Sequence, residues 1–171
     1  GTAGPLSLVD GLDDTFLVAN GDVLTTLPLA NLLAHHRLSG AAATIAMHRR
    51  QVYIDLGVIQ QNEEGRVTGY VEKPTYDFMV SMGIYVFEPR VLEYVIPRNA
   101  YLDFPDLVKR LIAAGEAVSG FSFDGYWQDL GRPDDYERAV EDFDRMRAEF
   151  LPPEAPVLFS SNGAGKHAVP A

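Results

Sequence analysis

The sequence predicts an α/β protein with a mixed sheet flanked by helices. Short apolar runs of strand length alternate with segments whose leucines recur at helical spacing, and glycines and prolines fall where elements end. The 171 residues are 47% hydrophobic, which suits one domain with a sizeable core. We expect a folded domain over residues 1–150 and a flexible C-terminal tail over 151–171, which is rich in proline, serine, glycine and alanine.

The first fifty residues predict a strand, a helix and a second strand. Residues 15–19 form an apolar run, and residues 28–39 carry leucines at helical spacing before Gly40, a typical helix stop. Residues 42–47 form the next apolar run. This order predicts a crossover between parallel strands.

The middle of the chain predicts a hairpin. Residues 54–60 and 66–72 are strand-like and flank Asn-Glu-Glu-Gly at 62–65. The remaining expected elements are a strand at 83–87, a short helix at 89–95, a helix at 105–114, a strand at 118–123 and a long amphipathic helix at 133–150.

Charge and composition narrow the functional classes. Fourteen Lys and Arg against 24 Asp and Glu leave a net charge of −10, which disfavours nucleic acid and anionic membranes as partners. No apolar run approaches the roughly 20 residues of a membrane span. The chain has no cysteine, which excludes disulfides and thiolate zinc sites and fits the cytoplasm.

Three short segments carry candidate chemistry. Asp22 follows an apolar strand within Asn-Gly-Asp, so it can present a carboxylate to Mg²⁺ at a strand end, although the same residues also form ordinary turns. Glu72 and Lys73 precede Pro74, which we expect to hold Lys73 extended with its charge available to a phosphate. The alternative is a solvated charge pair.

The third segment is Gly-Tyr-Trp-Gln-Asp-Leu-Gly at 125–131. It holds Asp129, a second candidate metal carboxylate, and its alternative interpretation is an aromatic corner before a helix. The histidines show no grouping typical of metal ligands, and we interpret them as surface or packing residues: His35, His36, His48 and His167.

Six segments in this order resemble the sugar-phosphate nucleotidyltransferases, the NDP-sugar pyrophosphorylases with a Rossmann-like (GT-A-like) core. They are GTAGPL at 1–6, FLVANGDVL at 16–24, LGVI at 56–59, GRVTGYVEKP at 65–74, VSMGIYVFEP at 80–89 and FDGYWQDLGRPDDYERA at 123–139. The resemblance implies transfer of a nucleotidyl group from a nucleoside triphosphate to a sugar 1-phosphate, with release of pyrophosphate.

The resemblance also implies site residues. Asp22 and Asp129 would hold Mg²⁺, Lys73 the phosphate of the sugar 1-phosphate, and Glu72 the sugar hydroxyls. Glycines that would let the sugar approach the backbone are Gly57 and Gly83, and the segment along the nucleotide base is Thr2, Ala3 and Gly4.

Two departures from the family pattern stand out. Ser81-Met82-Gly83 replaces the Asn-Ala-Gly or Thr-Gly of many relatives, and the 171 residues contain no G-x-G-x-R-L loop. In relatives this loop supplies backbone amides and an arginine to the triphosphate. We therefore expect an incomplete enzyme, lacking the N-terminal loop and inactive by itself, with an unpaired strand edge.

Two other functions remain open. One is a non-catalytic sugar-phosphate-binding or regulatory subunit of such an enzyme. The other is a GT-A glycosyltransferase, which expects a D-x-D motif where this chain has Gly21-Asp22-Val23. The similarity of GTAG to the guanylyl- and thymidylyl-transferring branches does not decide the sugar or the base, and the resemblance favours a homo-oligomer.

Overall fold

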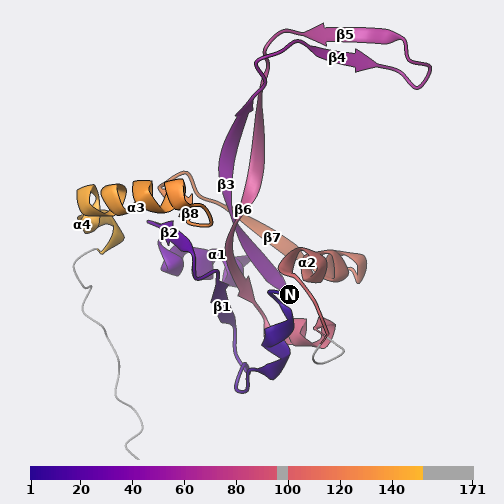
Figure 1. Cartoon of the computed structure of the whole chain (residues 1–171). Helices are drawn as coiled ribbons and strands as arrows, with labels where there is room; N and C mark the ends of the chain where they lie inside the picture. Colours follow the sequence, from indigo (N-terminus) through magenta and orange to yellow (C-terminus); the bar gives the residue numbers. More distant parts are fainter. Residues whose placement is uncertain (96–99, 152–171) are drawn as a thin grey trace, which may run out of the picture.

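A computed structural model describes residues 1–95 and 100–151 of the protein. Its central sheet has the strand order β1-β6-β3-β7, and two further pairs, β2-β8 and β4-β5, lie outside it (Figure 1). The strands are β1 (Phe16–Ala19), β2 (Val23–Thr25), β3 (Ala43–Tyr53), β4 (Val58–Gln61), β5 (Val67–Val71), β6 (Thr75–Phe87), β7 (Val118–Ser122) and β8 (Trp127–Asp129). The helices are α1 (Leu29–Ser39), α2 (Phe104–Ala113), α3 (Pro133–Arg145) and α4 (Arg147–Phe150), with 3₁₀ helices η1 (Gly4–Leu8) and η2 (Pro89–Tyr94).

The sheet is mixed, as the sequence predicts. Both β1 and β3 pair antiparallel with β6, and β3 pairs parallel with β7. Strands β1 and β3 therefore run in the same direction, as expected of a crossover through α1, but β6 lies between them. A strand more than fifty residues away along the chain takes the place beside β1, which local sequence patterns do not reveal.

Helices cover both faces of the sheet because residues of β6 alternate between two cores. Tyr85 and Phe87 belong to a cluster with η1, η2 and α2, and Phe104 stacks on Tyr85 at 4.6 Å between ring centroids. Ile84 and Val86 belong to a second cluster with α1. The side-chain period of two in a strand thus gives the expected sheet flanked by helices.

Strands β3 and β6 continue beyond the sheet as a two-stranded arm, and the β4–β5 hairpin extends sideways from the far end of the arm (Figure 1). Both strands are longer than predicted, because the chain pairs beyond the sheet through outer residues that are mostly exposed, apolar side chains such as Tyr76 and Phe78 included. The predicted hairpin is confirmed. Asn62 Oδ1 accepts hydrogen bonds from the backbone N–H groups of Glu64 and Arg66 at 3.1 and 2.9 Å, which fixes its turn.

The β2–β8 ladder attaches the third candidate segment to the sheet. Trp127 donates its Nε1–H to the carbonyl of Met82 at 3.0 Å, and Tyr126 donates its hydroxyl to Asp142 of α3 at 2.9 Å. Burial raises the pKa of Tyr126 to about 12, and the hydrogen bond to Asp142 is the second cause of this rise. The predicted helix at 133–150 is divided at Met146 into α3 and α4, and residues 152–171 of the predicted tail lie outside the described residues.

Gly83 makes the transition from arm to sheet possible. Register between β3 and β6 shifts here, from Ile45 opposite Tyr85 to Met47 opposite Ser81, and Gly83 has φ of 72°. A Cβ at this glycine would lie 2.7 Å from Asn20 Nδ2. The position therefore requires glycine for its backbone conformation and for its close approach to Asn20.

We expect Gly83→Ala to destabilise the protein more than Gly115→Ala. Gly115 also has a positive φ, 81°, but a Cβ there meets no atom within 4 Å. The control variant then loses about 1–2 kcal/mol from backbone strain, and Gly83→Ala loses a further 1–3 kcal/mol or so from the contact with Asn20. Urea unfolding measures both, and equal losses would show that Asn20 simply moves aside.

Candidate active site

A polar cleft of about 630 Å³ lies between the base of the arm, β8 and the start of α3. Its lining residues are His48, Arg50, Trp127, Gln128, Asp129, Gly131, Arg132, Asp135 and Arg138. The rings of His48 and Trp127 lie 5.5 Å apart between centroids, and His48 donates Nδ1–H to the carbonyl of Phe123 at 2.9 Å. These contacts fix one wall of the cleft, while its three arginines and Asp129 are exposed.

The two predicted metal carboxylates belong to neighbouring backbone segments. Asp129 pairs with Val23 in the β2–β8 ladder, and the N–H of Leu130 donates to the carbonyl of Asp22 at 2.8 Å. Asp129 Oδ1 accepts the N–H of Gly131 at 2.9 Å, and Asp129 lines the cleft. Two segments more than a hundred residues apart in the sequence thus meet at this ladder.

Of the predicted sugar and phosphate residues, Gly83 lies at the base of the arm, and the other three, Gly57, Glu72 and Lys73, lie elsewhere, where the arm meets its hairpin. Lys73 forms an ion pair with Asp55, with 2.8 Å between Nζ and Oδ1, and this pairing holds the pKa of Asp55 below its usual value. The hydroxyl of Tyr70 donates to Glu72 at 3.1 Å, and a Cβ at Gly57 would overlap the same hydroxyl. These three residues flank β4 and β5 at the far end of the arm, whereas Asp22 and Asp129 belong to the β2–β8 ladder at its base (Figure 1).

The expectation that Pro74 holds Lys73 extended is wrong. Lys73 has φ of 46°, in the left-handed region. The carbonyl of Pro74 accepts the N–H of Ile54 at 3.0 Å, so the chain must turn at Lys73 to enter β6 beside the end of β3. This long-range pairing overrides the local preference of a residue before proline.

The N-terminal segment at 2–4 packs onto the chain before α2. Thr2 N–H donates to Asp103 Oδ1 at 2.7 Å, and the N–H groups of Ala3 and Gly4 donate to the carbonyl of Leu102 at 2.9 and 3.0 Å. Ala3 is fully buried. Thr2 and Gly4 are therefore the members of this segment that retain exposed surface, and the segment does not line the cleft.

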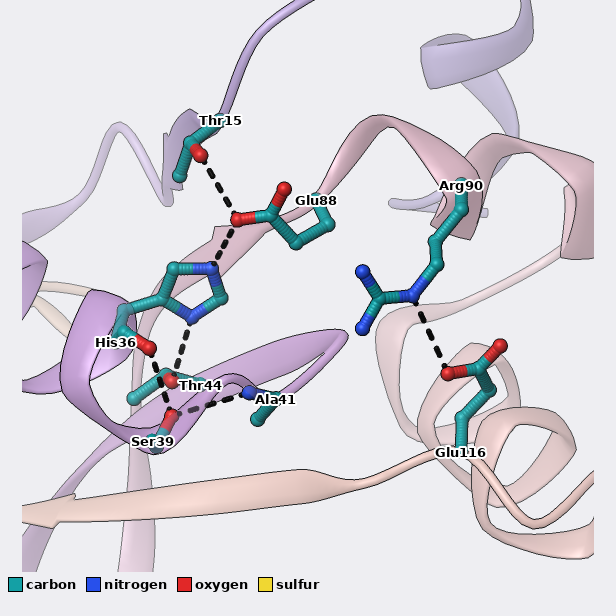
Figure 2. A network of polar contacts seen from close by, with 8 residues as sticks. All are labelled: Thr15, His36, Ser39, Ala41, Thr44, Glu88, Arg90 and Glu116. Atoms are coloured by element: carbon teal, nitrogen blue, oxygen red, sulfur yellow. Dashed lines mark hydrogen bonds and ion pairs between the residues drawn. The ribbon is translucent and has the colours of Figure 1, made fainter.

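A second polar cluster, buried between α1 and the sheet, centres on His36 (Figure 2). Its Nε2–H donates to Glu88 at 2.9 Å, its Nδ1 hydrogen-bonds the hydroxyl of Thr44 at 2.8 Å, and Thr15 donates to Glu88 at 2.8 Å. His36 is 1% exposed, so the interpretation as a packing residue holds, with its polar atoms satisfied. Its neighbour His35 instead contacts Ser119 of β7 at 2.9 Å.

The hydrogen bonds that Glu88 accepts in this cluster should make the free energy of unfolding depend on pH. The Thr15 hydroxyl, with a smaller effect of His36, holds the pKa of Glu88 below its ordinary 4.5. Its stabilising contribution is therefore present above the unfolded-state pKa and is lost as pH falls through the lower folded-state pKa. We expect Glu88→Gln to lower the free energy of unfolding at pH 7, with the difference from the natural sequence narrowing below about pH 4. A constant difference between pH 7 and 3 in urea titrations would contradict this.

Sequence reasoning missed the arginines of the cleft. His48 and Arg50 are two residues apart on β3 and line the cleft together, which the period of two in a strand makes possible. Asp135 and Arg138 are three apart on α3 and form a pair, with 3.7 Å between Oδ1 and Nη2. Both spacings were readable in the sequence, but their convergence required the tertiary structure.

Within residues 1–95 and 100–151, no group of three or more His, Asp or Glu side chains converges as metal ligands. In the same residues, no helix combines the length and apolar character needed to cross a membrane.

Comparison with known proteins shows which curated proteins the chain resembles. Mannose-1-phosphate guanyltransferase of Schizosaccharomyces pombe is 34% identical over 148 residues, covering 80% of this chain and 39% of that protein. UTP–glucose-1-phosphate uridylyltransferase of a Synechocystis species is 32% identical over 150 residues, covering 82% of this chain and 39% of the relative. The chain thus spans well under half the length of these curated relatives.

Solved structures share the fold. A glucose-1-phosphate thymidylyltransferase described as putative, from Bacillus anthracis and in complex with sucrose, superposes with a TM-score of 0.59 at 19% identity, covering 82% of this chain and 60% of that one. HddC from Yersinia pseudotuberculosis gives 0.56 at 22% identity, covering 84% of this chain and 62% of that one. The Nucleotidyl transferase family matches residues 1–145, and the chain therefore belongs to that family.

Proposed function

We propose that the chain supplies the metal- and sugar-phosphate-binding part of a sugar-1-phosphate nucleotidyltransferase. The reaction is transfer of a nucleotidyl group from a nucleoside triphosphate to a sugar 1-phosphate, giving an NDP-sugar and pyrophosphate. The observation that carries the proposal is the β2–β8 ladder, which joins the Asp22 and Asp129 segments beside a cleft with three arginines. Carboxylates next to guanidinium groups suit a metal-bound polyphosphate.

The donor set at this ladder fits Mg²⁺. Mg²⁺ prefers hard oxygen ligands and is usually held by one or two carboxylates together with substrate phosphates. Asp22 and Asp129 provide two carboxylates, and Asp129 Oδ1 is already oriented by the N–H of Gly131 at 2.9 Å. When bound, Mg²⁺ would neutralise charge on the phosphates, which together with positioning supplies most of the catalysis in phosphoryl-type transfer.

The chain's own residues bind and orient the substrates. A phosphate oxygen of the sugar 1-phosphate attacks the α-phosphorus, and the bond to the leaving pyrophosphate breaks. We assign Lys73 to the phosphate of the sugar 1-phosphate and Glu72 to the sugar hydroxyls. Gly57 and Gly83 would admit the sugar, and Thr2, Ala3 and Gly4 would flank the base. Because Lys73 and Glu72 lie on the arm, the proposal requires the arm to approach the ladder when substrates bind.

Mannose 1-phosphate with GTP is the substrate pair that we propose to test first. Several of the curated relatives are named as mannose-1-phosphate guanylyltransferases, and one is named for UTP and glucose 1-phosphate. We also propose a cytoplasmic location, where both substrate classes occur, and a homo-oligomeric state, which size-exclusion chromatography with light scattering tests.

A panel of nucleoside triphosphates against sugar 1-phosphates tests the function. The protein is assayed for pyrophosphate release with a G-x-G-x-R-L segment of the family joined to its N-terminus. Release that requires one sugar 1-phosphate supports the proposal. If no pair in the panel releases pyrophosphate while a sugar 1-phosphate still binds, the catalytic proposal is wrong and the non-catalytic subunit is favoured.

We expect Lys73→Ala to weaken sugar 1-phosphate far more than nucleoside triphosphate. A lost hydrogen bond to a charged group costs about 1.5–3 kcal/mol, or roughly a tenfold to hundredfold rise in KM for the sugar substrate. Lys109→Ala is the control, because Lys109 is an exposed lysine of α2 that pairs with Asp106 at 3.2 Å. Steady-state kinetics with each substrate varied in turn decides, and equal effects on both substrates would refute the assignment.

A further inference from the structure

We propose that the cleft between β3, β8 and α3 is a binding site for a diphosphate group, held by Arg50, Arg132 and Arg138. The inference deepens the proposed function and rests on it for the source of the ligand. The shared chemistry is a diphosphate, which occurs in a nucleoside triphosphate, in released pyrophosphate and in an NDP-sugar.

The arginines of the cleft are available to a ligand. In the described part of the chain, Arg50 and Arg132 form no ion pair or side-chain hydrogen bond. Arg138 pairs with Asp135 across 3.7 Å, and Arg138 is 69% exposed, so this pair contributes little and yields readily to a stronger anion. A planar guanidinium donates two parallel hydrogen bonds to phosphate oxygens, which makes arginine the side chain suited to this anion.

The charge of the cleft contrasts with that of the protein. Three arginines against Asp129 and Asp135 give 3 − 2 = +1 with His48 neutral, whereas the whole chain carries −10. A divalent cation on Asp129 would make the cleft more positive still. The cleft is therefore a local site of attraction for a polyphosphate on an otherwise repulsive surface.

The backbone around the cleft links the diphosphate site to the metal carboxylate. Gly131 N–H donates to Asp129 Oδ1 at 2.9 Å, and the carbonyl of Arg132 accepts the N–H groups of Asp135 and Tyr136, both at 3.1 Å. Asp129 and Arg132 are thus three residues apart on the short segment that leads into α3, with a hydrogen bond at each of them. A diphosphate held by Arg132 lies near any metal ion held by Asp129.

The wall and the size of the cleft suit a group larger than one phosphate. Trp127 and His48 are each anchored through a ring nitrogen to a backbone carbonyl, at 3.0 and 2.9 Å, so this wall exists before a ligand binds. A volume of about 630 Å³ lies within the range of roughly 300–1,000 Å³ typical of small-molecule sites. The cleft therefore has room for a diphosphate and for the group attached to it.

Isothermal titration calorimetry of the 171-residue protein with inorganic pyrophosphate, with and without Mg²⁺, tests the site. We expect saturable binding that Arg50→Ala and Arg132→Ala each weaken roughly tenfold to a hundredfold. Arg37→Ala is the matched control, since it removes an exposed arginine of α1 outside the cleft and the same charge. Arg132→Lys should show an intermediate loss, because it keeps the charge and loses the two-point contact. Melting temperatures identify any variant that is unfolded.

Parallel titrations with orthophosphate, mannose 1-phosphate, GTP and GDP-mannose distinguish the sources of the anion. The proposal expects the Arg50 and Arg132 variants to weaken the ligands that contain a diphosphate and to spare the two monophosphates. Absence of saturable pyrophosphate binding, an equal loss in Arg37→Ala, or losses confined to the monophosphates would each overturn it. Arginine-dependent pyrophosphate binding without turnover in the substrate panel would contradict the proposed function but support the diphosphate site. Turnover without arginine-dependent pyrophosphate binding would support the proposed function and contradict the diphosphate site.

Discussion

Replacing Asp22 or Asp129 by Asn is expected to abolish most of the Mg²⁺-dependent pyrophosphate release when a G-x-G-x-R-L segment is supplied. Each substitution removes one of the two carboxylates that we assign to the metal. The stabilisation of transition-state charge by a bound metal amounts to several kcal/mol, so the rate should fall by roughly a hundredfold or more.

The melting temperature should change little in these variants. Asp22 and Asp129 are exposed, and an Asn side chain at 129 keeps an oxygen that accepts the N–H of Gly131. Asp124→Asn, in the exposed loop before β8, is the matched control for loss of one negative charge. Near-normal turnover by either variant at saturating Mg²⁺ would show that the residue is not an essential ligand.

The 171 residues by themselves are expected to release no pyrophosphate above background. Catalysis requires the reacting atoms to be held in line, and the family resemblance implies that a G-x-G-x-R-L loop contributes backbone amides and an arginine to the triphosphate. This sequence contains no such loop. The arginines of the cleft can bind a diphosphate, but side chains on exposed, flexible stems do not replace a fixed set of amides.

Supplying the loop as a separate chain should restore measurable pyrophosphate release. Without the loop, the 171 residues should retain weak affinity for a sugar phosphate through Lys73 and Glu72. Pyrophosphate release is measured with and without the added chain at equal protein concentration. Robust turnover by residues 1–171 alone would overturn this expectation. It would point to Arg50, which lines the cleft, ahead of its neighbour Arg49, which does not, as the replacement for the loop.

The sequence predicted elements well where the signal was local. Apolar runs identified β1 and the inner halves of β3 and β6, and Gly40, with φ of 62°, ends α1 as its position suggested. The outer halves of β3 and β6 were missed because the arm is a pairing between strands far apart in the sequence that buries little, so burial does not mark these residues as strand. The break at Met146 was missed because residues on both sides are helix formers.

For the candidate site too, some features follow from the sequence and others only from the tertiary structure. By itself the sequence determined which residues carry charge at the ends of strands, Asp22, Lys73 and Asp129 among them, and the order of motifs that assigns the family. Only the tertiary structure decided that the Asp22 and Asp129 segments share a ladder, that Lys73 lies on an arm with φ of 46°, and that Arg50, Arg132 and Arg138 meet in one cleft. The physical reason is that backbone preference and apolar period act over a few residues, whereas strand pairing joins residues about a hundred positions apart and can override them.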